Sequence, residues 1–170
     1  MKYDVVALGE LLIDFTFDGK SNQGNNTYEA NPGGAPCNVL AMLNKMNKKT
    51  AFIGKVGNDA FGQILKKTID DVGIDSKGLM FDEHVNTTLA FVNIDENGER
   101  SFSFYRNPGA DMMLTEEEVD FEIIKNAKIF HFGTLSMTHE KVRMATKRAI
   151  DEAKKRNILI SFDPNLRPLL

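Results

Sequence analysis

The sequence predicts an α/β fold, in which a mostly parallel sheet is flanked by helices and a small β sheet protrudes. Short apolar runs rich in β-branched residues alternate with segments of helical periodicity, the order expected of parallel strands joined by helices. Two further β-rich runs flank Asn97-Gly98, a strong signal for a β-hairpin. The 170 residues contain no repeat or low-complexity linker, so we expect one domain over residues 1–170.

The first elements are two strands and a helix. Residues 3–9 form an apolar run that predicts a buried strand, and residues 13–17 alternate as a strand with one polar face. After a polar turn, residues 27–30 are expected to return as a partner strand. Pro36 suits the first turn of a helix. The apolar face predicted for that helix consists of Val39, Met42, Leu43 and Met46.

The next elements repeat the strand and helix order. Asn47 can end the first helix because Asn tolerates the left-handed conformation, and residues 50–56 are the next predicted strand. Asp59 is expected to cap a second helix, which Gly73 ends. The inward side chains predicted for that helix are Phe61, Ile64, Leu65, Ile69 and Val72.

The predicted hairpin consists of residues 87–94 and 99–105, and its apolar outer faces indicate that it pairs with the strand at residues 13–17. We therefore expect a lid sheet with strands at about 13–30 and 87–106. The main sheet is expected to continue with two buried strands, at residues 129–133 and 158–162. A helix at residues 142–153 is expected between them.

Charge and cysteine content limit the possible partners. The net charge of −3 and the pI near 5.6 argue against nucleic acid or an anionic membrane as the main partner, because both favour excess Lys and Arg. Cys37 is the single cysteine, so an intrachain disulfide is excluded. The N-terminal residues match neither a signal peptide nor a membrane span. A cytoplasmic protein is the prediction.

Candidate ligand-binding residues follow the first strands. Asp14 lies just beyond the first strand, where ligands bind in open α/β sheets, and its carboxylate can accept two charge-assisted hydrogen bonds. Gly33 and Gly34 let a ligand approach the backbone, and Asn38 in the following helical turn offers a donor and an acceptor. The alternatives are a solvated Asp on a strand face and an ordinary Gly-Pro turn before a helix.

Further candidates follow the hairpin and the last strand. Arg106, at the base of the lid, can close over a polar ligand, although a surface Arg capping a hairpin is common. Asn165 and Arg167 follow the strand at residues 158–162, where an ordinary polar loop is the alternative. The three histidines have no metal-ligand spacing, so we expect no metal site.

Four segments, in order, resemble the ribokinase-like (PfkB-type) carbohydrate kinases over the whole chain. Residues 6–14 resemble the family's opening strand with its sugar-binding Asp, and residues 33–62 resemble its first signature. Residues 98–111 and 162–168 are similar to the fructokinase subgroup. Two positions depart from the signature, which usually has a small residue and a Gly there: Leu40 and Asn47.

The resemblance implies transfer of the ATP γ-phosphate to fructose. It assigns sugar hydroxyls to Asp14, Gly33, Gly34 and Asn38, lid closure to Arg106, and the substrate and phosphate side to Asn165 and Arg167. It also implies that the lid sheet forms a homodimer interface.

The resemblance also implies what this chain lacks. Family members carry a later Gly-Ala-Gly-Asp loop, whose Asp takes the sugar proton, and an Asn-x-x-Glu stretch for Mg²⁺. The Gly-Ala-Gly-Asp loop does not occur in these 170 residues, and the resemblance places the family's Asn-x-x-Glu stretch beyond Leu170 as well. We therefore expect the Asp that acts as the base beyond Leu170 and no catalytic residue in this chain. ATP and Mg²⁺ sites are expected mostly outside the chain as well, and the chain alone is expected to be inactive.

Two other functions stay open at this point. A 2-keto-3-deoxygluconate kinase of the same family would use Arg106 and Arg167 to pair with the carboxylate of its substrate. A non-catalytic sugar-binding or dimerisation module is the alternative of another class, since the proton acceptor is absent from the chain.

Overall fold

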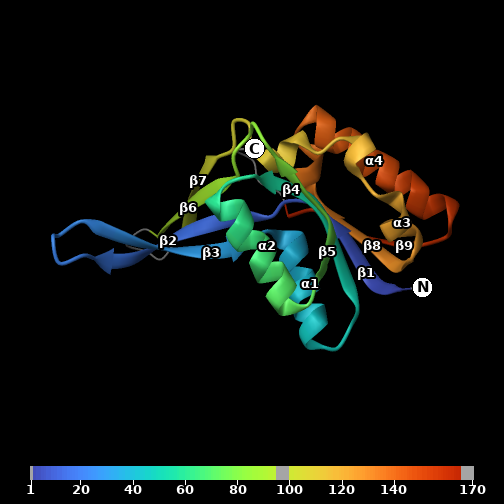
Figure 1. Ribbon diagram of the computed structural model, residues 1–170, viewed down its shortest axis with the longest axis horizontal. Coiled ribbons are helices and arrows are strands. Elements are labelled where there is room, and N and C mark those ends of the chain that lie inside the picture. The colour runs from blue at the N-terminus through green and yellow to red at the C-terminus, as the bar shows by residue number, and fades with distance from the viewer. Residues whose placement is uncertain (1, 95–99, 166–170) are drawn as a thin grey trace.

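A parallel sheet forms the centre of the computed structural model, which describes residues 2–94 and 100–165 (Figure 1). Within those residues the sheet has the strand order β5-β4-β1-β8-β9, and all four neighbouring pairs are parallel. This confirms the predicted mostly parallel sheet. Its strands are β1 (Tyr3–Leu8), β4 (Thr50–Gly57), β5 (Asp75–Asp82), β8 (Ala127–Gly133) and β9 (Leu159–Asp163).

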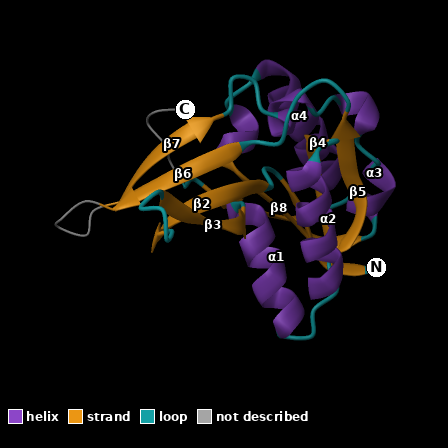
Figure 2. Ribbon diagram, turned by 60° about the vertical axis from the view of Figure 1, so that its left-hand side comes forward, coloured by secondary structure: helices purple, strands orange, loops and turns teal. Residues whose placement is uncertain are grey.

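Helices cover both faces of this sheet, as Figures 1 and 2 show. In β1, Val5 and Ala7 pack toward α1 and α2, whereas Val6 and Leu8 pack toward α4. Because alternate side chains of a strand point to opposite faces, a strand buried on both sides has a continuous apolar run. The helices are α1 (Ala35–Lys45), α2 (Ala60–Val72), α3 (Phe121–Lys125) and α4 (Glu140–Lys155).

The predicted helix ends are confirmed. Asp59 caps α2 by accepting a hydrogen bond of 2.8 Å from the Gly62 N–H, and Gly73 ends it in the left-handed conformation with φ 89°. Pro36 lies in the first turn of α1, and Asn47 follows that helix with φ 60°.

The apolar face predicted for α1 is largely wrong. Met42 and Met46 are 61% and 59% exposed, and Val39 is also exposed. Cys37 and Leu40 are buried instead, on the second stripe of the helix with spacing i, i+3, and the turn before α1 sets this rotation. Ile64 of α2, which was also predicted to be inward, is exposed.

The strand β5 is not predicted by the sequence analysis. It starts with Asp75-Ser76-Lys77-Gly78 and lies at the edge of the described sheet. An edge strand covered on part of its surface tolerates polar residues, so it lacks the apolar run that identified β1 and β4.

A second sheet forms the predicted lid, with the strand order β3-β2-β6-β7. The strand β6 pairs in parallel with β2, from Ile13 opposite Leu89 to Thr16 opposite Val92. The pairing expected between the hairpin and residues 13–17 is therefore confirmed, whereas the turn at Asn97-Gly98 lies outside the described residues. The lid strands are β2 (Leu12–Lys20), β3 (Asn26–Gly33), β6 (Leu89–Ile94) and β7 (Arg100–Tyr105).

The lid sheet extends away from the central sheet (Figure 1). Its strand β2 begins four residues after β1, and β3 leads directly into α1 through Gly34. The lid is therefore joined to the carboxyl end of β1 on one side and to the N-terminus of α1 on the other. Among the described residues, no helix is long and apolar enough to cross a membrane.

Candidate functional site

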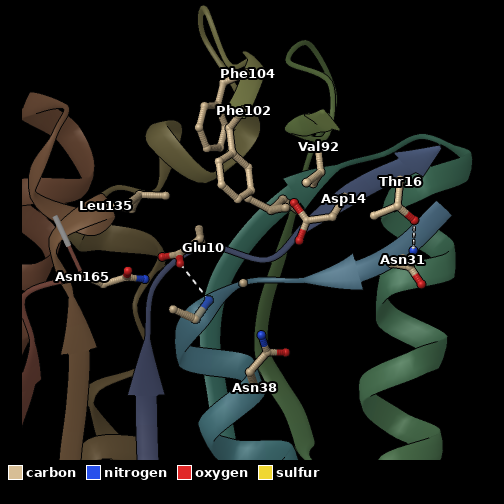
Figure 3. Close-up of a pocket in the computed structure, with 13 residues that line it drawn as sticks. Glu10, Asp14, Thr16, Asn31, Asn38, Val92, Phe102, Phe104, Leu135 and Asn165 are labelled. Atoms are coloured by element: carbon tan, nitrogen blue, oxygen red, sulfur yellow. Dashed lines mark hydrogen bonds between the residues drawn. The ribbon is translucent and has the colours of Figure 1, made fainter. Parts of the chain in front are cut away.

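A cavity of about 450 Å³ lies between the lid sheet and the carboxyl ends of the central strands (Figure 3). In open α/β sheets ligands bind beyond these strand ends, so the position is that of a binding site. Its lining comes from both sheets and from α1: Glu10, Leu12, Asp14, Thr16, Asn31, Gly34, Ala35, Asn38, Val92, Phe102, Phe104, Leu135 and Asn165.

Asp14 and Gly33 are fitted to each other across β2 and β3. Asp14 is half-buried and lines the cavity. A Cβ added to Gly33 would stand 2.2 Å from Oδ2 of Asp14, which is closer than atoms approach without a shift. Gly33 therefore leaves the space that the Asp14 carboxyl occupies, although Gly33 itself is not among the lining residues.

Gly34 makes the turn from β3 into α1 possible. Its φ of 126° favours glycine, and an added Cβ would stand 2.4 Å from the carbonyl oxygen of Glu10. The turn places the backbone N–H of Ala35 so that it donates a hydrogen bond of 2.9 Å to Oε1 of Glu10. One glycine thus joins the loop after β1 to the start of α1.

Glu10 is the cavity residue with the most unusual surroundings. It is 4% exposed, and its Oε2 is buried without a hydrogen-bond partner. Burial raises the pKa of Glu10 to about 7; hydrogen bonds from its own N–H and from the Ala35 N–H act in the opposite direction. The charge of Asp111 raises the pKa further, and that of Arg106 lowers it.

The cavity has a polar floor and a more apolar lid. Phe102 and Phe104 of β7 lie above Glu10 and Asp14 in the view of Figure 3, and Val92 of β6 lines the same side. Polar residues line the floor and the inner lid strands. Two of them are joined by a hydrogen bond of 2.9 Å, which Asn31 Nδ2 donates to Thr16 Oγ1.

Two further predicted site residues, Asn38 and Asn165, line the cavity. Asn38 lies exposed in the first turn of α1 and lines the cavity. Asn165 reaches the cavity from the loop after β9, where its N–H donates a hydrogen bond of 3.1 Å to Oδ1 of Asp163.

Residues 166–170 lie outside the described residues, and two of these positions enter the predictions. Arg167 is one of them, so its predicted place beside Asn165 stays a prediction. Leu170 is the other, and the base Asp expected beyond Leu170 likewise stays a prediction. The lining of the cavity therefore includes predicted binding residues, and no catalytic base is predicted among the described residues.

Arg106 follows β7, but it is not among the residues that line this cavity. It forms a buried ion pair of 2.7 Å with Oδ2 of Asp111 and donates to Oγ1 of Thr138 at 2.9 Å and to the carbonyl oxygen of Leu135 at 3.1 Å. Arg106 lines a second, neighbouring cavity of about 420 Å³ instead. The structure does not bring it together with Asp14 and Asn38.

Several lining residues were not predicted from the sequence. Thr16 lies two residues after Asp14 on β2, so the period of a strand could have identified it. Asn31 pairs with Asp14 across the strands, which becomes visible only with the register. Glu10 follows the first apolar run and was not predicted as a site residue. Among the described residues, no group of three His, Cys, Asp or Glu side chains is placed to hold a metal ion.

Comparison with known proteins identifies relatives of the whole chain. The family model for pfkB family carbohydrate kinases matches residues 2–170. Fructokinase-2 of Oryza sativa subsp. japonica is 47% identical over 165 residues, which are 96% of this chain and 49% of that protein. Fructokinase-1 of Zea mays is 45% identical over 168 residues, which are 98% of this chain and 52% of that protein. The chain spans about half the length of the curated relatives it matches.

Solved structures show the same fold. A fructokinase from Xylella fastidiosa has a TM-score of 0.93 and 33% identity, and the match covers 99% of this chain and 52% of that chain. A structure of fructokinase from Xylella fastidiosa with bound ATP has a TM-score of 0.91 and 33% identity, covering 100% and 51%. These matches confirm the predicted fold class.

Proposed function

Because the chain belongs to the pfkB family of carbohydrate kinases, we propose that the complete protein phosphorylates fructose with ATP and that this chain supplies its sugar-binding part. The observation that carries the proposal is the cavity under the lid, with its polar floor and aromatic cover. A sugar presents hydroxyls on its edges and C–H groups on its faces, so it matches such a cavity on both sides.

Each predicted site residue has a role in this proposal. Asp14 accepts hydrogen bonds from neighbouring sugar hydroxyls, and Gly33 keeps the space for its carboxyl free. Asn38 binds a further hydroxyl from the first turn of α1. Asn165 faces the substrate and phosphate side, where Arg167 would join it. Gly34 contributes by placing α1.

Arg106 supports the base of the lid rather than the sugar. Its guanidinium is held by Asp111, Thr138 and the carbonyl of Leu135, and a movement toward a ligand would break the buried ion pair with Asp111. The same observation favours fructose over 2-keto-3-deoxygluconate. With Arg106 occupied, the described lining contains two carboxyl groups, Glu10 and Asp14, which disfavour a carboxylate substrate.

Phosphoryl transfer itself is proposed for the complete protein. ATP is its second substrate, in agreement with the ATP-bound relative. The Asp that takes the sugar proton is proposed to follow Leu170, in a part of the fold that this chain does not contain. The described residues offer no group of three ligands for Mg²⁺, so we assign no metal ligand and no step of the transfer to them. The 170-residue chain alone is proposed to bind sugar without turning it over.

We also propose a homodimer formed through the outer face of the lid. Aromatic side chains cover this face, and three of them are exposed: Phe17 by 56%, Tyr28 by 40% and Tyr105 by 66%. Phe91 joins them, with its ring centroid 5.5 Å from that of Tyr28 and 5.4 Å from that of Tyr105. Such a patch is typical of an interface. Sedimentation should show a dimer that Tyr105→Ser weakens.

Isothermal titration of the 170-residue chain with D-fructose tests the sugar-binding proposal. We expect saturable binding that Asp14→Ala weakens at least about tenfold, because a charge-assisted hydrogen bond contributes about 1.5–3 kcal/mol. Asp18→Ala is the matched control, since Asp18 is exposed on the same strand and outside the cavity lining. Tighter binding of 2-keto-3-deoxygluconate than of fructose would contradict the choice of substrate.

A further inference from the structure

The unpartnered oxygen of Glu10 is the buried polar group that the roles above leave unexplained. Oε1 accepts the hydrogen bond from the Ala35 N–H, whereas Oε2 is buried with no partner. A buried carboxyl oxygen without a hydrogen bond costs roughly 1–3 kcal/mol, and more when it is charged. Native structures keep few such atoms, and they call for a specific explanation.

No neighbouring group in the described part of the chain is placed to satisfy this oxygen. The groups with the largest effects on the pKa of Glu10 are its own N–H, the Ala35 N–H, Asp111 and Arg106. Glu10 also acts on the buried thiol of Cys37, which is only a weak hydrogen-bond donor. The two N–H groups leave Oε2 without a hydrogen bond. Asp111 is itself an acid, and the guanidinium of Arg106 is already bound to Asp111 and Thr138. Repacking within the described residues therefore offers Oε2 no obvious donor.

A ligand in the cavity can provide the missing partner. Glu10 lines the cavity, so its side chain borders the space that a sugar would occupy. The last side-chain torsion of Glu is broad and roughly twofold. A small rotation of the carboxyl group can therefore present Oε2 to the cavity while Ala35 stays bound to the other oxygen.

We propose that Glu10 is a substrate-binding residue, whose Oε2 forms a hydrogen bond with one sugar hydroxyl that Asp14 does not bind. The proposal rests on the proposed function and adds a specificity-determining contact to it. With a pKa of about 7, Glu10 is available in both protonation states near neutral pH. A hydroxyl suits both, because it can donate to the carboxylate and accept from the neutral acid.

Deoxy sugars can separate this contact from a structural role. The wild-type chain and its Glu10→Ala and Glu10→Gln variants are titrated with D-fructose and its monodeoxy analogues. We expect Glu10→Ala to weaken fructose binding about 10- to 100-fold. One deoxy analogue should bind the wild type about 10- to 100-fold more weakly than fructose does. The same analogue and fructose should bind the Glu10→Ala variant with equal affinity. Glu10→Gln keeps an acceptor for Ala35 and gains a donor, so it should stay within about fivefold of the wild type.

The remaining outcomes are informative in either direction. If Glu10→Ala weakens every sugar equally, the residue only supports the fold, and the proposal is overturned. It is also overturned if Glu10→Ala binds fructose as the wild type does, as expected if a water satisfies Oε2. Glu140→Ala, at an exposed glutamate in α4, controls for loss of a carboxyl. If Asp14→Ala alone abolishes binding, the proposed function stands without the Glu10 contact, whereas no fructose binding by the wild type would overturn both.

Discussion

Replacing Gly33 by Ala should disable the sugar site without unfolding the protein. The new Cβ would stand 2.2 Å from Oδ2 of Asp14 and 3.4 Å from Cδ1 of Leu12. The backbone of Gly33 does not have a positive φ, so alanine is tolerated there. The atom that must move is the end of a flexible side chain. We therefore expect the free energy of unfolding to change by less than about 1 kcal/mol.

The effect on binding should be much larger, because Asp14 must rotate out of its position. Losing two charge-assisted hydrogen bonds at about 1.5 kcal/mol each weakens binding about 100-fold. Titration calorimetry with D-fructose measures this loss, and urea denaturation measures the free energy of unfolding of the same preparation.

Gly34→Ala is the matched comparison, with the opposite expected result. Here φ is 126°, and the added Cβ would meet the backbone carbonyl oxygen of Glu10 at 2.4 Å. Backbone cannot move as a side chain tip does, so the free energy of unfolding should fall by about 3 kcal/mol or more. The reasoning is refuted if Gly33→Ala binds fructose as the wild type does, or if both variants lose the same stability.

Three further predictions concern the chain as a whole. The 170-residue chain should release no ADP from ATP and fructose above a no-protein blank, because the base is expected beyond Leu170; turnover lost on Asp14→Ala would contradict this division of roles. Arg106→Met should lower the free energy of unfolding by about 3–5 kcal/mol in urea, because Asp111 is left buried and unpaired; a change below about 1 kcal/mol would contradict this. Burial raises the pKa of Glu10 from 4.5 to about 7, so between these values the folded state holds a proton that the unfolded state has lost. The proton on Glu10 therefore stabilises the folded state fully below pH 4.5, and about 3 kcal/mol of this stabilisation is lost as the pH rises through about 7. The free energy of unfolding of Glu10→Gln, relative to that of the wild type, should rise by that amount between about pH 4 and about pH 8.

The fold was predictable where burial on both faces leaves a clear pattern. The strands β1, β4 and β8 are apolar runs, and the ends of α2 follow from Asp59 and Gly73, whose roles depend only on local geometry. The strand β5 was not predictable in this way, since it begins with Asp75-Ser76-Lys77-Gly78 and carries no such run. The face of α1 was wrong because two stripes of the helix have helical spacing, and only the packing selects the one with Leu40.

Residues of the candidate site were predictable from the sequence where their type and their position beside a strand or helix end indicate one role. Paired glycines before a helix indicate a turn that a ligand can approach, and Asp14 and Asn38 were found from their positions beside strand and helix ends. Arg106 was located at the base of the lid, but its partner Asp111 follows five residues later and takes up its charge. A sequence cannot show which of several nearby carboxyls an Arg selects, since that depends on burial.

The two glycines also explain how two carboxyl groups reach one small cavity. Gly33 makes room for the carboxyl of Asp14, and Gly34 makes room for the backbone of Glu10 and directs the Ala35 N–H to its side chain. Two ionised carboxylates in one enclosed site repel each other, and the burial of Glu10 reduces this cost by favouring its neutral form. A ligand rich in hydroxyls suits a cavity that offers the carboxyl of Asp14 as an acceptor and Glu10 as a group that can donate or accept. An anionic ligand would be repelled by a charged carboxyl group, and this supports the proposal that the ligand is a neutral sugar.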